Sequence, residues 1–135
     1  MGIGGIVMNN EVQTKEGALI LDSHKLAYHY ERVKAWEHGE RIAPVSVDMA
    51  LTRSCGAMCK FCYAQMQEAQ ERAPIRTQDA LNLLDDFKEI GVKAVSLVSD
   101  GESTLSKAFV PFIQHAADIG IDVGLATNGW EFETN

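Results

Sequence analysis

The chain has 135 residues, a formal net charge of −7 and a sequence pI near 5.0. Such an acidic balance argues against binding to nucleic acid or to an anionic membrane through charge, because both ligands attract basic surfaces. The apolar fraction of 46% predicts a globular protein with one sizeable core, and no apolar run approaches the length that spans a bilayer.

Residues 1–44 predict an N-terminal extension that carries one amphipathic helix. Ala18–Leu21 has the composition of a short strand. The helix is expected to begin after Asp22-Ser23, two favourable N-cap residue types, and to end at Gly39. Side chains at helical spacing predict its packing stripe: Leu26, Tyr30, Val33 and Trp36.

Residues 45–135 alternate between strand and helix patterns. A period of two predicts a strand over Val45–Leu51, which leads directly into a cysteine-rich loop. Helix-forming composition follows over Tyr63–Arg72. The next helix is expected to be capped by Thr77 and ended by Gly91. Its predicted buried face consists of Ala80, Leu81, Leu84 and Phe87.

Two further strands complete the pattern. The apolar run Val92–Val98 predicts the second strand, and Ile121–Ala126 predicts the third. Between them a helix closed by Gly120 is marked by Leu105, Phe109, Phe112, Ile113 and Ala116. This order predicts an α/β fold with parallel strands joined by right-handed crossovers. The loops "RSCGAMCKFCYA", "SDGES" and "TNG" each follow a strand, so we expect them to converge at one edge of the sheet.

All three cysteines lie in the first of these loops, at Cys55, Cys59 and Cys62, with the spacing C-x3-C-x2-C. An odd number of clustered thiols in a chain whose start lacks a secretory pattern predicts metal binding in the reducing cytoplasm. Thiolates suit zinc, copper(I) and iron–sulfur clusters. Structural zinc would need a fourth ligand, such as the distant His115 or an N-terminal histidine. Three cysteines would instead leave one iron of a 4Fe–4S cluster open to another ligand.

The motif C-x3-C-x-aromatic-C, with Phe61 as the aromatic residue, resembles the signature of the radical S-adenosylmethionine (radical SAM) superfamily. The loop "SDGES" resembles the Gly-Gly-Glu motif of that family at Gly101 and Glu102, with Asp100 in place of the first glycine. The third-strand ending "LATNG" is similar to family members as well. The resemblance covers residues 25–129.

The resemblance implies that Cys55, Cys59 and Cys62 hold a 4Fe–4S cluster whose open iron binds S-adenosyl-L-methionine. Reductive cleavage of this co-substrate would give a 5′-deoxyadenosyl radical that abstracts a hydrogen atom from the substrate. The residues expected to bind the co-substrate or the substrate are Phe61, Gly101, Glu102, Thr127 and Asn128. Simpler interpretations stay open, because Glu102 could begin a helix, Phe61 could lie in the core, and Asn128-Gly129 is a common turn pair.

The family resemblance predicts a partial TIM barrel of about three strand–helix units with an N-terminal helical lead-in. The missing units predict that the chain is a fragment or truncated gene product, or else that a second half-barrel or a partner chain completes it, because both edges of the sheet would otherwise stay open. The substrate is a small molecule, peptide or protein, and the expected electron donor resembles flavodoxin or ferredoxin. The rival hypothesis is a small zinc-binding or iron–sulfur redox module without S-adenosylmethionine chemistry.

Overall fold

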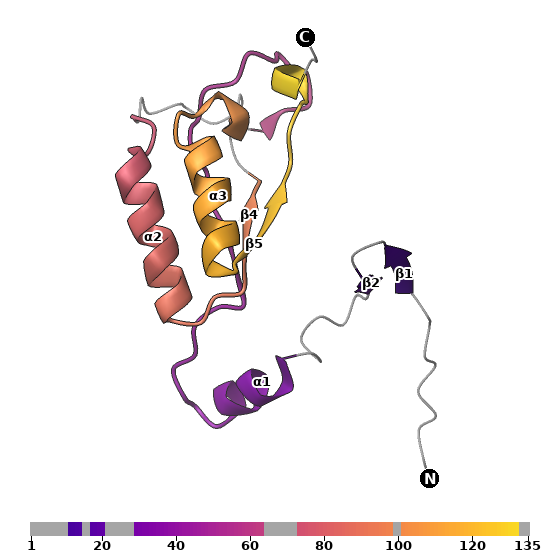
Figure 1. Ribbon diagram of the computed structural model, residues 1–135, viewed down its shortest axis with the longest axis vertical. Helices are drawn as coiled ribbons and strands as arrows, with labels where there is room; N and C mark the ends of the chain where they lie inside the picture. Colours follow the sequence, from indigo (N-terminus) through magenta and orange to yellow (C-terminus); the bar gives the residue numbers. More distant parts are fainter. Residues whose placement is uncertain (1–10, 15–16, 21–28, 64–72, 99–100, 133–135) are drawn as a thin grey trace. The chain divides into compact units, whose positions relative to one another are not determined.

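The computed structural model describes residues 11–14, 17–20, 29–63, 73–98 and 101–132 (Figure 1). The chain divides into two compact units, Met1–Ile42 and Ala43–Asn135. The sequence-based division into an N-terminal extension (residues 1–44) and a core (residues 45–135) stays a prediction. Among the described residues, no helix is long and apolar enough to cross a bilayer.

The first unit contains a two-stranded antiparallel sheet and a short helix. Strand β1 (Glu11–Thr14) pairs with β2 (Gly17–Ile20), which confirms the predicted strand at residues 18–20 and adds an unpredicted partner. Helix α1 (Tyr30–Glu37) is followed by Gly39, whose φ of 81° suits glycine at a helix end. The expected start of this helix at residues 22–23 lies outside the described residues.

The packing stripe predicted for this helix is wrong at its two aromatic positions. Tyr30 and Trp36 are 62% and 65% exposed, and α1 has no buried residue. Helical spacing alone therefore did not identify a buried face in the described part of this helix.

The described residues of the second unit form a three-stranded parallel sheet with two α-helices. Strands β3 (Ser46–Asp48), β4 (Ala94–Leu97) and β5 (Asp122–Leu125) pair in that spatial order. Helix α2 (Thr77–Glu89) connects β3 to β4 in sequence, and α3 (Phe109–Ile119) connects β4 to β5. The two helices lie side by side along the sheet (Figure 1). The predicted α/β fold with parallel strands is confirmed.

One apolar core lies between the sheet and the two helices. Val95 and Leu97 point into it from β4, as the alternation of a strand requires. The other buried members come from the segment after β3, from α2 and α3, and from their flanks: Leu51, Ala80, Leu84, Ala108, Phe112, Ala116 and Ile121. This core fixes the ends of β3, β4 and β5 relative to one another.

Two sequence expectations for these helices change in detail. Arg76 is the N-cap of α2, and Thr77 is its first helical residue. Leu105 lies in a separate 3-10 helix, η3 (Ser103–Leu105), and is 43% exposed rather than part of α3. Except for Tyr63, the helix expected over residues 63–72 falls outside the described part of the chain.

Candidate functional site

The three loops that follow β3, β4 and β5 are joined by hydrogen bonds at the carboxyl edge of the sheet. The backbone N–H of Glu102, after β4, donates to the carbonyl of Ser54, after β3, at 2.8 Å. The backbone N–H of Asn128, after β5, donates to Oε2 of Glu102 at 2.7 Å. The predicted convergence of the three loops is therefore confirmed.

Glu102 is only 3% exposed and is the centre of this arrangement. Its Oε1 accepts from the backbone N–H of Thr104 at 3.2 Å, from the hydroxyl of Thr104 at 2.8 Å and from the hydroxyl of Thr127 at 2.8 Å. We use the name Glu102 network for the four residues Glu102, Thr104, Thr127 and Asn128. Glu102 is also the N-cap of η3, so the simpler interpretation of a carboxylate at a helix start describes part of its role.

Two opposing effects act on the ionisation of Glu102. Burial alone would raise the pKa of its carboxyl group, because it disfavours the charged form. Hydrogen bonds from Asn128, Thr104 and Thr127 stabilise the carboxylate and outweigh burial, so the pKa lies below its ordinary value. Glu102 is consequently a carboxylate at neutral pH.

Gly101 lies against the backbone of the strand-end segment before the cysteines. A Cβ at this position would lie 2.4 Å from the carbonyl oxygen of Thr52 and 2.7 Å from the Cα of Arg53. Backbone atoms cannot move aside as a flexible side chain can, so only glycine fits. Gly101 thus permits a close contact between the loop after β4 and the segment that leads into the cysteine loop.

The cysteine loop holds three free thiols. Cys55 is exposed, and Cys59 and Cys62 are partly exposed. The N–H of Cys62 donates to the carbonyl of Cys59 at 3.0 Å, which closes a turn between these two cysteines. Ala57 is buried and anchors the loop. No group of three or more His, Cys, Asp or Glu side chains in the described parts of the chain is arranged to hold a metal ion.

Asn128 connects the loop after β5 to the cysteine loop. Its side-chain nitrogen lies 3.9 Å from Sγ of Cys55. The surrounding turn is stabilised by the N–H of Gly129, which donates to the Thr127 hydroxyl at 3.0 Å, and Gly129 itself has a φ of 79°. The Asn128-Gly129 pair is thus both a turn, as the simpler interpretation held, and a contact to a predicted metal ligand.

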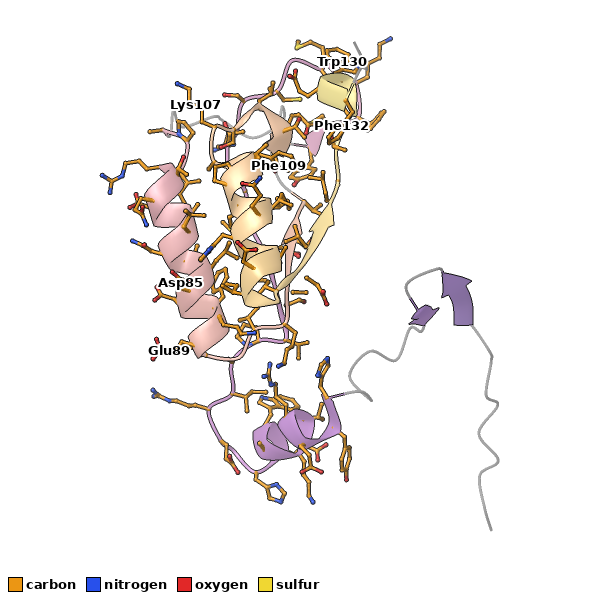
Figure 2. All side chains as sticks on the ribbon, viewed as in Figure 1. Asp85, Glu89, Lys107, Phe109, Trp130 and Phe132 are labelled. Carbon is orange, nitrogen blue, oxygen red and sulfur yellow. The ribbon has the colours of Figure 1, made fainter. Side chains whose placement is uncertain are left out.

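Aromatic side chains surround this edge of the sheet. Phe61 is 87% exposed, so the alternative that it belongs to the core is wrong. The ring of Trp130 lies next to Gly56, where a Cβ would be 3.6 Å from the ring. Figure 2 shows Trp130 and Phe132 at the end of this unit that is opposite to Glu89, the last residue of α2.

Sequence reasoning did not identify Thr104 or Trp130 as part of the site. Thr104 follows Glu102 by two residues, a spacing at which a side-chain carboxylate often accepts from the backbone. Trp130 carries no comparable local signal, because its contact to Gly56 depends on the tertiary structure. His115, one proposed zinc ligand, instead links α3 to α2, because its Nε2 lies 2.7 Å from Oδ1 of Asp85.

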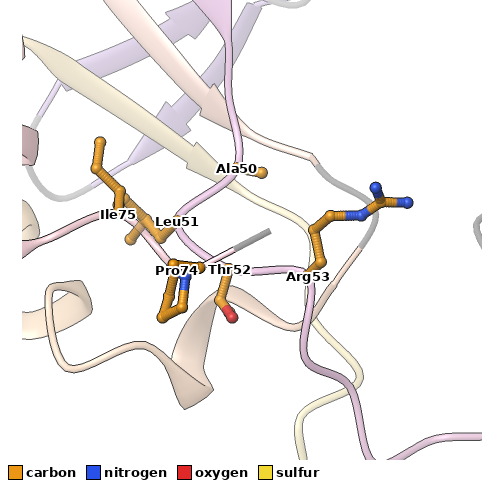
Figure 3. A pocket seen from close by; sticks show the side chains of 7 residues that line it. Ala50, Leu51, Thr52, Arg53, Pro74 and Ile75 are labelled. Carbon is orange, nitrogen blue, oxygen red and sulfur yellow. The ribbon is translucent and has the colours of Figure 1, made fainter. Parts of the chain in front are cut away.

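A pocket of about 470 Å³ adjoins the cysteine loop (Figure 3). One wall is the segment after β3 and the other is the segment before α2, held together by a hydrogen bond from the N–H of Ile75 to the carbonyl of Leu51 at 3.2 Å. Its volume is in the range of small-molecule pockets. The lining residues are Ala50, Leu51, Thr52, Arg53, Ala73, Pro74 and Ile75.

The chain is similar in sequence to several S-adenosylmethionine-dependent and related enzymes. It is 32% identical over 79 residues to the Fe-coproporphyrin III synthase of Methanosarcina barkeri, covering 58% of this chain and 20% of that protein. It is 28% identical over 95 residues to an S-adenosylmethionine-dependent nucleotide dehydratase of Flammeovirga pacifica, covering 67% and 32%. The GTP 3′,8-cyclase of Psychromonas ingrahamii is 31% identical over 90 residues, covering 64% and 26%. No protein-family model matches the chain.

The fold is similar to one solved structure, Streptococcus suis SuiB bound to its precursor peptide SuiA. The TM-score is 0.60 at 18% identity, and the match covers 92% of this chain and 28% of SuiB. The chain therefore spans between 20% and 32% of the length of the first curated relatives and 28% of this structural neighbour.

Proposed function

We propose, from the premise that this chain resembles the N-terminal part of the radical SAM core, that Cys55, Cys59 and Cys62 hold a 4Fe–4S cluster. The resemblance is confirmed by the S-adenosylmethionine-dependent relatives and by the shared fold of SuiB. With S-adenosylmethionine, such a cluster supplies reductive cleavage to methionine and a 5′-deoxyadenosyl radical, which removes a hydrogen atom from the substrate. The observation that carries the proposal is the joining of three strand-end loops around the cysteine segment by the Glu102 network.

The donor set fits this group by its chemistry. Three thiols stand on one short loop, none of them is consumed in a disulfide, and each has solvent access through which iron and sulfide can enter. The turn between Cys59 and Cys62 keeps two of the donors close along the backbone. A 4Fe–4S cluster with three protein thiolates leaves one iron for a further ligand, and this is the place we assign to S-adenosylmethionine.

The remaining predicted residues divide into supporting and binding groups. Oε1 of Glu102 already accepts three hydrogen bonds, whereas Oε2 accepts the one from Asn128. We assign Oε2 as the atom that would accept from the co-substrate's amino group, a charge-assisted hydrogen bond. Gly101, Thr127 and Asn128 would bind beside it. Phe61 is exposed and free to pack on an adenine ring, which would exclude water from that side.

We extend the proposal to the organisation of the whole enzyme. Residues 45–135 would form the first units of the radical SAM core, and residues 1–44 would form an extension. An electron donor of the flavodoxin or ferredoxin type would reduce the cluster, in a reducing compartment such as the cytoplasm. The substrate class stays broad. The named relatives are a synthase, a dehydratase and a cyclase, and SuiB binds a peptide, which supports a small molecule or a peptide as the candidate.

Anaerobic reconstitution with iron and sulfide tests the proposal. We expect a brown protein with about four irons per chain, whose reduced electron paramagnetic resonance (EPR) signal changes on addition of S-adenosylmethionine. Separate Cys55→Ser, Cys59→Ser and Cys62→Ser variants should lose most of this iron, while Lys107→Ala, a change at an exposed residue outside the cysteine loop, should keep it. A colourless protein with one zinc per chain would instead support the rival zinc module. A brown protein whose reduced EPR signal does not change on addition of S-adenosylmethionine would support the redox module.

A further inference from the structure

The side chain of Asn128 has a fixed orientation. Its Oδ1 accepts a hydrogen bond from the backbone N–H of Trp130 at 3.0 Å, so this end of the amide must be the oxygen. The nitrogen therefore faces the other way, towards Sγ of Cys55 at 3.9 Å. The backbone of the same residue is held by Glu102 at 2.7 Å. The backbone N–H and the side-chain oxygen of Asn128 are thus both held by hydrogen bonds within the chain.

The hydrogen-bonding role of Cys55 changes when its sulfur becomes a metal ligand. In the free thiol, Sγ lies 3.9 Å from the carbonyl oxygen of Ala57 and can donate its proton there. A thiolate has no proton to donate and is a better acceptor. The contact to Ala57 is lost as a hydrogen bond, and the contact to the Asn128 amide gains strength.

We propose that the Asn128 amide donates an N–H···S hydrogen bond to the Cys55 thiolate and thereby raises the reduction potential of the cluster, with Glu102 as the positioning residue that holds Asn128 in place. This inference rests on the proposed function. Reduction adds negative charge to the cluster and its sulfur ligands, so a donor beside one sulfur stabilises the reduced form more than the oxidised form. Hydrogen bonds to sulfur are among the factors that set iron–sulfur potentials.

An EPR-monitored redox titration of the reconstituted chain, without S-adenosylmethionine, measures the effect. Asn128→Ser keeps a hydroxyl that can accept from the Trp130 N–H but is too short to reach Cys55. We expect its ratio of reduced to oxidised cluster at a fixed potential to fall roughly fivefold to tenfold, where tenfold equals 59 mV for a one-electron couple. Asn128→Asp keeps the shape and the accepting oxygen but places a negative charge by the sulfur, so it should fall further.

Two companion variants separate tuning from loosening of the loop. Thr127→Val loosens the same loop, because it removes the hydrogen bond to Glu102 and the acceptor of the Gly129 N–H, but it leaves the Asn128 amide, so its potential should stay near that of the wild type. Glu102→Asp keeps the carboxylate charge but shortens the side chain, so it weakens the support of Asn128 and should shift towards Asn128→Ser. Equal potentials for the wild type and Asn128→Ser would overturn the inference, and so would a fall in Thr127→Val as large as that in Asn128→Ser.

The failure of this inference is distinguishable from failure of the proposed function. A wild-type chain that takes up no iron would remove both. A wild type with about four irons and variants at the same potential would remove this inference alone. If Asn128→Ser does not load iron, resonance Raman spectra of the wild type in H₂O and D₂O decide: we expect the iron–cysteine stretching bands to shift on exchange, and unshifted bands would overturn the hydrogen bond.

Discussion

Glu102 and Asn128 are 26 residues apart in sequence and are joined by a hydrogen bond of 2.7 Å from the Asn128 backbone to the Glu102 carboxylate. The same carboxylate binds the hydroxyl of Thr127, so the loop after β5 is held at two adjacent residues by the loop after β4. The backbone of Glu102 is in turn bonded to Ser54, directly before Cys55. One buried residue, through its carboxylate and its backbone N–H, therefore joins all three loops at this edge of the sheet.

Replacement of this carboxylate by its neutral isostere should destabilise the second unit. In Glu102→Gln, one carboxylate oxygen becomes an NH₂ group, which cannot accept a hydrogen bond. Depending on which oxygen is replaced, either the Asn128 N–H or the donors of Thr104 and Thr127 lose their acceptor, so at least one buried donor is left unpaired. Such a loss typically costs about 1–3 kcal/mol. The free energy of unfolding from urea titration followed by circular dichroism measures the change.

Glu89→Gln provides the matched control, because it makes the same chemical change at an exposed residue at the end of α2. It should change the free energy of unfolding by no more than about 0.5 kcal/mol. Equal stabilities of Glu102→Gln and the wild type would mean that the network contributes no net stability to the fold.

The low pKa of Glu102 makes the stability of this unit depend on pH. The hydrogen bonds hold the folded-state pKa below the ordinary value of 4.5, so the folded protein binds fewer protons than the unfolded chain. The stabilisation is complete above the ordinary pKa and is lost as the pH falls through the lower folded-state value. Urea midpoints measured from pH 7 downwards should therefore decrease more steeply in acid for the wild type than for Glu102→Gln. Parallel pH profiles for the two proteins would contradict this origin of the acid sensitivity.

The sequence predicted the parts of the fold that local pattern determines. Two strands were identified from the alternation at Val47 and Met49 and from the apolar run that contains Val95 and Leu97. Both signals depend only on residues that are neighbours in sequence. Gly91 and Gly120 identified helix ends, where φ values of 87° and 69° favour glycine. Since each of the three loops follows a parallel strand, their convergence was also predictable.

The sequence could not show how the site residues contact one another. Glu102 was expected to bind a ligand, and the hydrogen bonds that its carboxylate accepts from Thr127 and Asn128 depend on the register of β4 and β5. The same holds for Gly101, whose close contact with the backbone of Thr52 and Arg53 joins segments about 50 residues apart in sequence. The exposure of Tyr30 and Trp36 was missed because periodicity indicates a common face without showing what covers it.

Addition of one methyl group at Gly101 should be costly, while the same addition in β5 should not. Gly101→Ala places a Cβ 2.4 Å from the carbonyl oxygen of Thr52, and the backbone there must shift. Overpacking of this kind costs about 1–3 kcal/mol. Gly124→Ala is the control, because its Cβ meets no atom within 4 Å and the residue lies in an exposed position of β5. Thermal melts of both variants should show a lowered midpoint for Gly101→Ala only; similar midpoints would show that the strand-end backbone can move aside at little cost.

The position of Trp130 gives a fluorescence test of cluster binding that does not depend on catalysis. The chain has two tryptophans, so Trp36→Phe leaves Trp130 as the sole indole fluorophore. The Trp130 ring lies beside Gly56, the residue after Cys55, and iron–sulfur clusters absorb broadly in the near ultraviolet and visible, which favours energy transfer from a close indole. We therefore expect anaerobic reconstitution of Trp36→Phe to quench most of its emission. The same treatment should leave the emission of a variant that also carries Cys55→Ser, Cys59→Ser and Cys62→Ser unchanged. Strong emission from a Trp36→Phe protein that has taken up its iron would place the cluster away from the Cys55 loop, because energy transfer to a cluster on that loop should quench the emission of the adjacent Trp130 indole.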